Sequence, residues 1–273
     1  MSRETDSDEP RATATYVYCL ARAPSPPALG GAPTGLPGAG PPRAIAAGGE
    51  LWLVASTVPL ADYDEPAIEA GLQDVEWVGE RAAAHQAVVE LVAGRTTVVP
   101  MQLFTLFRDD RRAVEELGGR RDELAAIFDR LAGREEWGVR AHFDAERARS
   151  FVGDGEAATS GRDYLRRKQR QRDLPRLLAG QAREAAEALF RRLDEQADAA
   201  TRRAGGDGMG SLLLDAAFLV SASRHDAFER LVEEESNQLG ATAPVVVTLS
   251  GPFPPYSFVG GPPSAHGDES GSP

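Results

Sequence analysis

The run Val245-Val246-Val247-Thr248-Leu249 is apolar and mostly β-branched, and it continues directly into Ser250-Gly251-Pro252-Phe253-Pro254-Pro255-Tyr256-Ser257-Phe258. The first part predicts a strand over Ala243–Leu249. The second part alternates prolines with aromatic residues. Because proline has no backbone N–H and a fixed φ, we expect this part to leave the strand as a stiff, extended tail. Its three rings are expected to fold back into the core of their own domain, and contact with a partner is the alternative.

The sequence before this run predicts a half of the chain that is rich in helix. Apolar residues recur at three-to-four spacing from about Arg162 to Arg203, which indicates a long helical region with one apolar stripe. Pro175 lies inside it, so we expect a kink there or a new helix capped by Asp173. A strand over Leu212–Ser221 and a helix opened by a capping box at Ser223–Asp226 complete this half.

The N-terminal half reads as a sheet with helices. A helix is predicted over Asp74–Ala93, and Gly118-Gly119 interrupts a second helical stretch. Pro100 places one of the strands at an edge or a bulge. Helices packed on one face of a mixed sheet indicate a ferredoxin-like α+β arrangement. The predicted strands are Thr15–Ala21, Leu51–Ser56, Thr96–Leu103 and Trp137–Phe143.

Shifts in composition divide the chain. A Pro/Gly/Ala stretch from Ala23 to Gly49 predicts a long, partly mobile loop, and Gly205–Gly210 predicts a turn-rich bridge. The expected divisions are a disordered tail at 1–13, an N-terminal α+β domain at 14–149, a linker at 150–161, a C-terminal α+β domain with the tail at 162–259, and a second disordered tail at 260–273.

The composition favours a protein that stays inside the cell. With 30 basic and 42 acidic residues the formal net charge is −12, which repels nucleic acid and anionic membranes, so neither is expected as a partner. Cys19 is the only cysteine, so the chain forms no internal disulfide, which suits a reducing cytoplasm. The sequence shows neither a signal-peptide core nor a run of membrane-spanning length, and we expect a cytoplasmic location.

The residue types that carry chemistry do not cluster. His85, His142, His225 and His266 lack the paired spacing of a helical zinc site, and each is expected to be structural or solvated. Neither a Gly-x-Ser-x-Gly elbow nor a Gly-Lys-Ser/Thr phosphate loop occurs. We therefore predict no catalytic, metal-binding or cofactor-binding residue and no enzyme activity. A ferredoxin-like domain that senses a small ligand, or an enzyme of unknown substrate, is the alternative.

Five patterns follow one another along the chain: Tyr16–Tyr18, Thr96–Phe107, Trp137–Arg140, Gly161–Lys168 and the terminal Gly251–Phe258. Together they resemble the GvpL/GvpF family of gas vesicle proteins. Phe253 stands where the family more often has Trp, which keeps the ring and loses the indole donor. Gln102 stands where the family often has Lys or Arg, so a positive charge is missing there.

The resemblance implies a modified ferredoxin-like N-terminal domain and a smaller ferredoxin-like C-terminal domain with a long helix and an aromatic, proline-rich tail. It also implies a non-enzymatic accessory or minor structural protein of gas vesicle formation, which binds the apolar shell subunit and assists nucleation or assembly. The implied partners are that subunit and other gas vesicle accessory proteins. Whether the chain acts as chaperone, nucleator or scaffold, whether it stays in the mature shell, and whether it is of the F or L type are left open.

Seven positive charges gather at the start of the predicted long helical region of this otherwise acidic chain. At about 100° per residue they go nearly all round the helix, so a solvated helix paired with local acids is expected. Contact with an acidic partner surface is the alternative. The candidate partner contacts come from this cluster and from the terminal stretch: Arg162, Arg166, Arg167, Lys168, Gly251, Pro252, Phe253, Pro254, Pro255, Tyr256 and Phe258.

Overall fold

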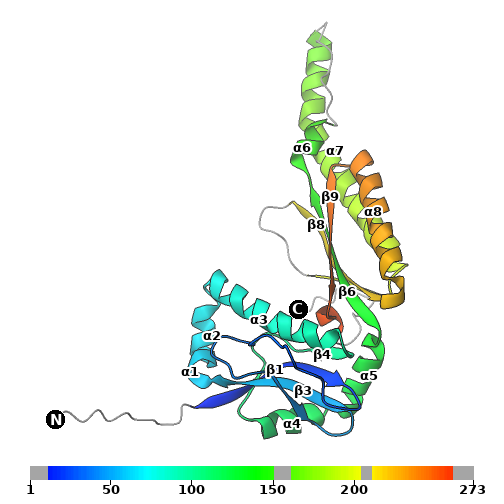
Figure 1. Cartoon of the computed structure of the whole chain (residues 1–273). Coiled ribbons are helices and arrows are strands. Elements are labelled where there is room, and N and C mark those ends of the chain that lie inside the picture. The colour runs from blue at the N-terminus through cyan, green and yellow to red at the C-terminus, as the bar shows by residue number, and fades with distance from the viewer. Residues whose placement is uncertain (1–11, 151–160, 204–210, 261–273) are drawn as a thin grey trace, which may run out of the picture. The chain divides into compact units, whose positions relative to one another are not determined.

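The computed structural model describes residues 12–150, 161–203 and 211–260, without the side chains of residues 161–171 (Figure 1). The two expected tails and the Gly205–Gly210 bridge therefore lie almost wholly outside the described residues. The chain divides into two compact units. The first unit holds the described residues up to Ala132 together with Pro254–Val259, and the second holds Gly133–Phe253 and Gly260.

The first unit is built on a five-stranded antiparallel sheet. Four of its strands lie in the order β2-β3-β1-β4, and β5 also pairs with β1. In chain order the elements are β1 (Thr13–Arg22), β2 (Arg43–Ala46), β3 (Leu51–Pro59), α1 (Leu60–Tyr63), α2 (Glu65–Gly71), α3 (Val75–Ala93), β4 (Val98–Pro100), β5 (Leu106–Phe107), α4 (Asp110–Gly118), α5 (Arg121–Leu131) and, from the end of the chain, a 3-10 turn η2 (Tyr256–Phe258).

The strand β1 lies inside this sheet and is buried along almost its whole length. Figure 1 shows α3 on one side of the sheet and α4 on the other. From α3, Val88 and Val92 join a core that they share with Tyr16 and Tyr18 of β1. From α4, Leu117 is buried as well. A continuous apolar run is what a strand covered on both faces requires, and β1 has one.

The second unit is built on a four-stranded antiparallel sheet in the order β7-β8-β6-β9. Two long helices, α7 and α8, pack against this sheet and against each other (Figure 1). Their apolar stripes bury Leu189, Leu193 and Phe228 against Phe218 of β8. The elements are β6 (Arg134–Phe143), α6 (Ala145–Ser150), α7 (Gly161–Asp194), β7 (Ala199–Arg202), β8 (Leu212–Ser221), a 3-10 turn η1 (Ala222–Arg224), α8 (His225–Thr242) and β9 (Val245–Phe253).

The predicted mixture of helices and sheets is confirmed. The sheet of the first unit, expected to be mixed and to carry helices on one face, is instead antiparallel with helices on both faces. The predicted helix over Asp74–Ala93 is α3, and Asp74 caps it by accepting the N–H of Glu76 at 2.9 Å. The predicted glycine break is also confirmed, because α4 ends at Gly118 and α5 starts at Arg121. Among the described helices, none is both long enough and apolar enough to cross a bilayer.

Three short strands were missed, because each has only two to four residues and is defined by its pairing with a longer strand: β2 with β3, β5 with β1, and β7 with β8. The stretch Ala23–Gly49, expected to be a loop, contains β2, which forms because Ile45 pairs with Leu53 on β3. The region expected to be helical up to Arg203 ends at Asp194, and β7 follows it, paired with β8. Conversely, the strand expected over Thr96–Leu103 has only the three residues of β4.

Two local signals were misread. No new helix starts at Asp173, because α7 continues through Pro175; burial of the later apolar stripe offsets the backbone hydrogen bond that proline removes. The expected capping box at Ser223–Asp226 does not form. Since the turn η1 precedes α8, the helix starts at His225 without a side-chain cap, and the Ser223 hydroxyl lies 2.9 Å from that of Ser221.

The end of the chain departs most from expectation. β9 does not stop at Leu249 but runs through Pro252 to Phe253. A proline is tolerated there because β9 is an edge strand, where one side of the backbone pairs with none of the described strands. The unit division also differs from the expected linker at 150–161. Since β6 pairs with β8 and β9, residues from Gly133 onward belong to the second unit.

Candidate functional site

The terminal stretch predicted as a partner contact is shared by the two units. Gly251, Pro252 and Phe253 are exposed at the end of β9 in the second unit. Gly251 has φ 126°, and a Cβ there would come within 2.9 Å of the Glu136 carbonyl oxygen, so only glycine fits this position. From Pro254 onward the stretch belongs to the first unit.

The aromatic rings of this stretch lie in different surroundings. Phe258 is 4% exposed, and its carbonyl oxygen accepts a hydrogen bond from the Arg130 guanidinium at 2.9 Å. Tyr256 is half-buried beside the core of the first unit, with its ring 6.1 Å from the imidazole of His85. Phe253 is 36% exposed. The predicted packing of the rings on the chain itself is thus confirmed for two of them, but on the first unit instead of their expected domain.

His85 and Tyr16 form a buried polar pair in the core of the first unit. The Tyr16 hydroxyl lies 2.6 Å from His85 Nδ1, and the His85 side chain is almost completely buried. Burial raises the pKa of Tyr16 and lowers the pKa of His85 to about 4, because both charged forms would lose their hydration. Both groups are therefore neutral at neutral pH, which agrees with the structural histidine that the sequence predicts.

The polar residues around this pair come from one face of α3, a pattern that the sequence analysis missed. Trp77, Arg81 and His85 recur at four-residue spacing. The Arg81 guanidinium lies 3.9 Å from the Trp77 ring centre and 5.6 Å from that of Tyr63, so it is held by two cation–π contacts. The four-residue spacing places these residues on one face of a helix, and the two-residue spacing places Tyr16 and Tyr18 on one face of a strand. These two spacings are the signal that could have revealed the cluster.

The stretch Trp137–Arg140 on β6 has a structural role in the second unit. The Trp137 ring packs at 4.8 Å against His225 in the core between sheet and helices. A Cβ at Gly138 would lie 2.7 Å from the Ser250 hydroxyl on β9, so a larger residue would displace that side chain. Arg140 Nε lies 3.1 Å from an Asp215 carboxylate oxygen on β8. This stretch therefore joins β6 to its neighbours.

The basic candidates Arg162, Arg166, Arg167 and Lys168 lie on the first turns of α7, where the structure describes the helix but not the side chains. Their side-chain contacts therefore lie outside what the structure describes. Arg172, further along α7, is exposed and lies 3.8 Å from the neighbouring Asp173 carboxylate.

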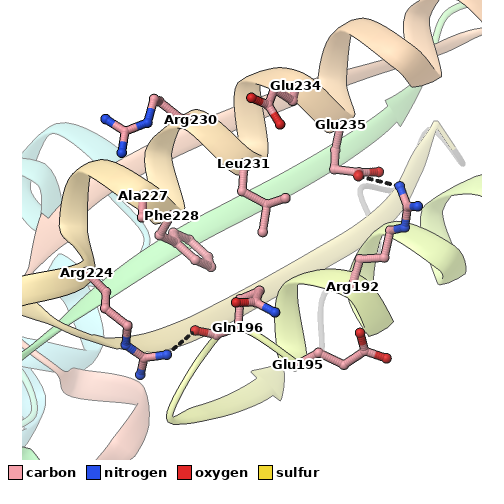
Figure 2. Close-up of a pocket in the computed structure, with 10 residues that line it drawn as sticks. All are labelled: Arg192, Glu195, Gln196, Arg224, Ala227, Phe228, Arg230, Leu231, Glu234 and Glu235. Carbon is pink, nitrogen blue, oxygen red and sulfur yellow. Dashed lines mark hydrogen bonds and ion pairs between the residues drawn. The ribbon is translucent and has the colours of Figure 1, made fainter.

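A groove of about 490 Å³ lies between α7 and α8 in the second unit (Figure 2). Figure 2 shows Leu231 and Phe228 of α8 pointing toward α7, where they form an apolar floor. Two of the charges beside them are paired, Arg192 with Glu235 and Arg224 with Asp198 at 2.7 Å, and Glu195, Arg230 and Glu234 also line the groove. Apolar side chains among charged ones suit contact with another protein surface.

The described residues offer little for catalysis. Across the described ranges, no three or more His, Cys, Asp or Glu side chains are placed to hold a metal ion. Cys19 is completely buried in β1, and burial raises the pKa of its thiol, which disfavours the reactive thiolate. The arrangement can bind through apolar side chains and strand backbone.

Substitution of Phe258 tests whether the terminal stretch holds the first unit together. We expect Phe258→Ala to lower the melting temperature by several degrees, since truncation of a buried Phe costs about 3–5 kcal/mol. Phe253→Ala is the matched control, and because its ring is partly exposed the loss should be much smaller. Calorimetry of both variants checks this, and equal melting curves for Phe258→Ala and the wild type would contradict it.

His85 gives a prediction about pH. Its folded pKa lies below its unfolded value of about 6.5, so the unfolded chain takes up a proton first as the pH falls. The stabilisation from neutral His85 is complete above about pH 6.5 and is lost toward pH 4, by about 3 kcal/mol in total. An NMR titration of the imidazole, assigned with His85→Gln, should show no protonation until the pH approaches 4. Titration near pH 6.5 would refute the buried placement.

The chain is similar to known proteins over almost the whole of both units. The family model described as gas vesicle synthesis protein GvpL/GvpF matches residues 14–260. Gas vesicle protein L of Streptomyces sp. (strain CB03234) is 36% identical over 266 residues, covering 90% of this chain and 92% of the relative. Gas vesicle protein F of the same strain is 28% identical over 257 residues, covering 90% and 99%.

Solved structures agree in fold. The crystal structure of the gas vesicle protein GvpF from Anabaena sp. PCC7120 superposes with a TM-score of 0.67 at 17% identity, covering 93% of this chain and 99% of that one. The crystal structure of GvpF from Microcystis aeruginosa gives a TM-score of 0.63 at 17% identity, covering 90% and 99%. From the family match over 14–260 and the 36% identical relative, the chain belongs to the GvpL/GvpF family of gas vesicle synthesis proteins.

Proposed function

We propose that this chain is a non-enzymatic accessory protein of gas vesicle formation, which binds the apolar shell subunit in the cytoplasm and assists nucleation or assembly. The observation that carries the proposal is the family match over residues 14–260. The two relatives compared above are named as gas vesicle proteins. Other accessory proteins of the same process are the further partners that we propose.

The physical reason for such a protein lies in the shell. A wall between gas and water presents apolar surface to the gas, so its subunit exposes apolar surface before it is assembled. Exposed apolar surface and unpaired strand edges cause aggregation. A partner that covers this surface transiently, and itself carries a net charge of −12, would keep the subunit in solution until it is delivered.

The proposal extends to the fold of each unit, which we infer to be a variant of the ferredoxin-like arrangement. Numbered by their order in the unit, the four principal strands of both sheets lie in the order 2-3-1-4. In the second unit, helices follow the first and third of these strands, as the βαββαβ pattern requires. In the first unit, the stretch Ala23–Gly49 replaces the first helix.

Partner contact within the terminal stretch is proposed for its exposed part alone. Gly251, Pro252 and Phe253 are accessible on β9, whereas Pro254 and Phe258 are buried in the first unit.

A small-ligand sensor is the second candidate function. It is favoured by the groove between α7 and α8, whose volume lies in the range of about 300–1,000 Å³ that small ligands occupy. We prefer the accessory role, because the family match over residues 14–260 supports it and nothing comparable supports a small-ligand sensor.

A pull-down of the shell subunit between 0.1 M and 1 M salt tests the proposed function. Screening shortens the Debye length from about 10 Å to about 3 Å over this range, while apolar burial persists or strengthens. We expect the wild type to capture the subunit at both salt concentrations. The variant Arg166→Ala, Arg167→Ala, Lys168→Ala should weaken capture by less than about fivefold, since exposed ion pairs contribute little.

The control for this variant removes three arginines from the first unit: Arg108→Ala, Arg111→Ala, Arg112→Ala. These side chains are exposed and pair locally with acidic neighbours, so capture should not change. Loss of capture at high salt, or with the variant on α7 alone, would show an electrostatic interaction and would contradict binding through apolar surface. Absence of capture by the wild type would refute the proposed function itself.

A further inference from the structure

The edge strand β9 differs from the other sheet edges of the described chain. It is nine residues long and hydrogen-bonds to β6 on one side, and none of the described strands pairs with its other side. Unpaired N–H and C=O groups along such an edge form a template for another strand. An edge of this kind that is not protected by charge is a place where a partner adds its own strand.

The remaining sheet edges are protected. β2 has four residues, and its Arg43 pairs with Asp110 at 2.6 Å. β7 also has four residues, and its Arg202 makes two hydrogen bonds to Glu187. β4 has three residues, all buried, and β5 has only two. Short length, charge and burial are the usual means by which proteins block edge pairing. β9 has them only at its first residue, Val245, which is buried and whose carbonyl oxygen accepts a hydrogen bond from the Arg147 guanidinium at 3.2 Å; from Val246 to Gly251, before Pro252, the strand has none of them.

The side chains of β9 carry no charge. In a chain of which 26% of residues are charged, the run Val245–Phe253 contains no charged residue. Val246 is 41% exposed and Phe253 is 36% exposed, and the polar residues between them, Thr248 and Ser250, are exposed as well. The strand therefore has both an open backbone edge and exposed apolar and hydroxyl side chains on one face of the sheet.

From these observations we propose that the outer edge of β9 binds an extended, uncharged, β-branched strand of the shell subunit by antiparallel or parallel strand addition. The inference rests on the proposed function, which supplies the partner, and it identifies the surface that the partner uses. Charge complementarity favours this occupant, because a charged strand would lose hydration beside Val246 without meeting an opposite charge on β9. Backbone hydrogen bonds supply the affinity, and Val246 and Thr248 supply side-chain contacts on one face.

A variant with two lysines on the exposed face, Val246→Lys and Thr248→Lys, tests the proposal in the full chain. Lysine on an edge strand opposes strand addition, and both positions are exposed, so the fold should be kept. We expect the variant to lose capture of the shell subunit at least about tenfold, with its melting temperature unchanged within a few degrees. The matched control is Leu177→Lys, which places a lysine at a 62% exposed leucine on α7 and should capture normally.

Hydrogen exchange on the wild-type chain gives a second readout that does not depend on the variant. On addition of purified shell subunit, amides in Val246–Gly251 should become protected, because a new strand would pair with those that face outward. Capture by the wild type together with undiminished capture by the double variant, or with no protection in β9, would overturn the β9 proposal and leave the proposed function standing. A wild-type dimer that the lysines dissociate, with capture unaffected, would identify a second copy of this chain as the occupant and would also overturn it.

Discussion

Burial of the Phe258 ring is the interaction that ties the end of the chain to the first unit. Phe258 is almost completely removed from water, and the Arg130 guanidinium fixes its backbone. Burial of a large apolar side chain contributes about 1.5–3 kcal/mol, a considerable fraction of the 5–15 kcal/mol by which a domain is stable. Because the same stretch continues β9 without a spacer, a single segment serves as an exposed edge of one unit and as core of the other.

Several buried polar groups of the first unit form hydrogen bonds with one another. A neutral His85 and Tyr16 share one short contact, and Tyr18 donates to Ser56 while it accepts from the Leu36 amide. Buried polar groups that bond one another fix a unique arrangement of the strands and helices around them. The second unit also buries carboxylates, Glu136 paired with Arg203 at 2.6 Å and Glu235 paired with Arg192, beside the packed rings of its core.

Local patterns predicted most of the elements, and pairing across the chain explains what they missed. Asp74 and the apolar spacing after it were sufficient to place α3, and an apolar run followed by prolines and glycines was sufficient for β1. The strand β2 was missed because the Pro/Gly/Ala composition around it indicated a loop, whereas Ile45 pairs in a hairpin with Leu53, eight residues further on. The aromatic residues of the terminal stretch predicted that its rings would be buried. The place where Phe258 is buried, beside Arg130, could not be predicted, because these two residues are 128 positions apart in sequence.

The return of Pro254–Val259 to the first unit has a consequence for biosynthesis. A domain made of one continuous segment can fold as soon as that segment leaves the ribosome, and N-terminal domains usually do so first. Here the six residues that complete the first unit are translated only after the whole of Gly133–Phe253. Until then the site beside Arg130 lacks Phe258, so the order of synthesis delays completion of the N-terminal unit until the second one has been made.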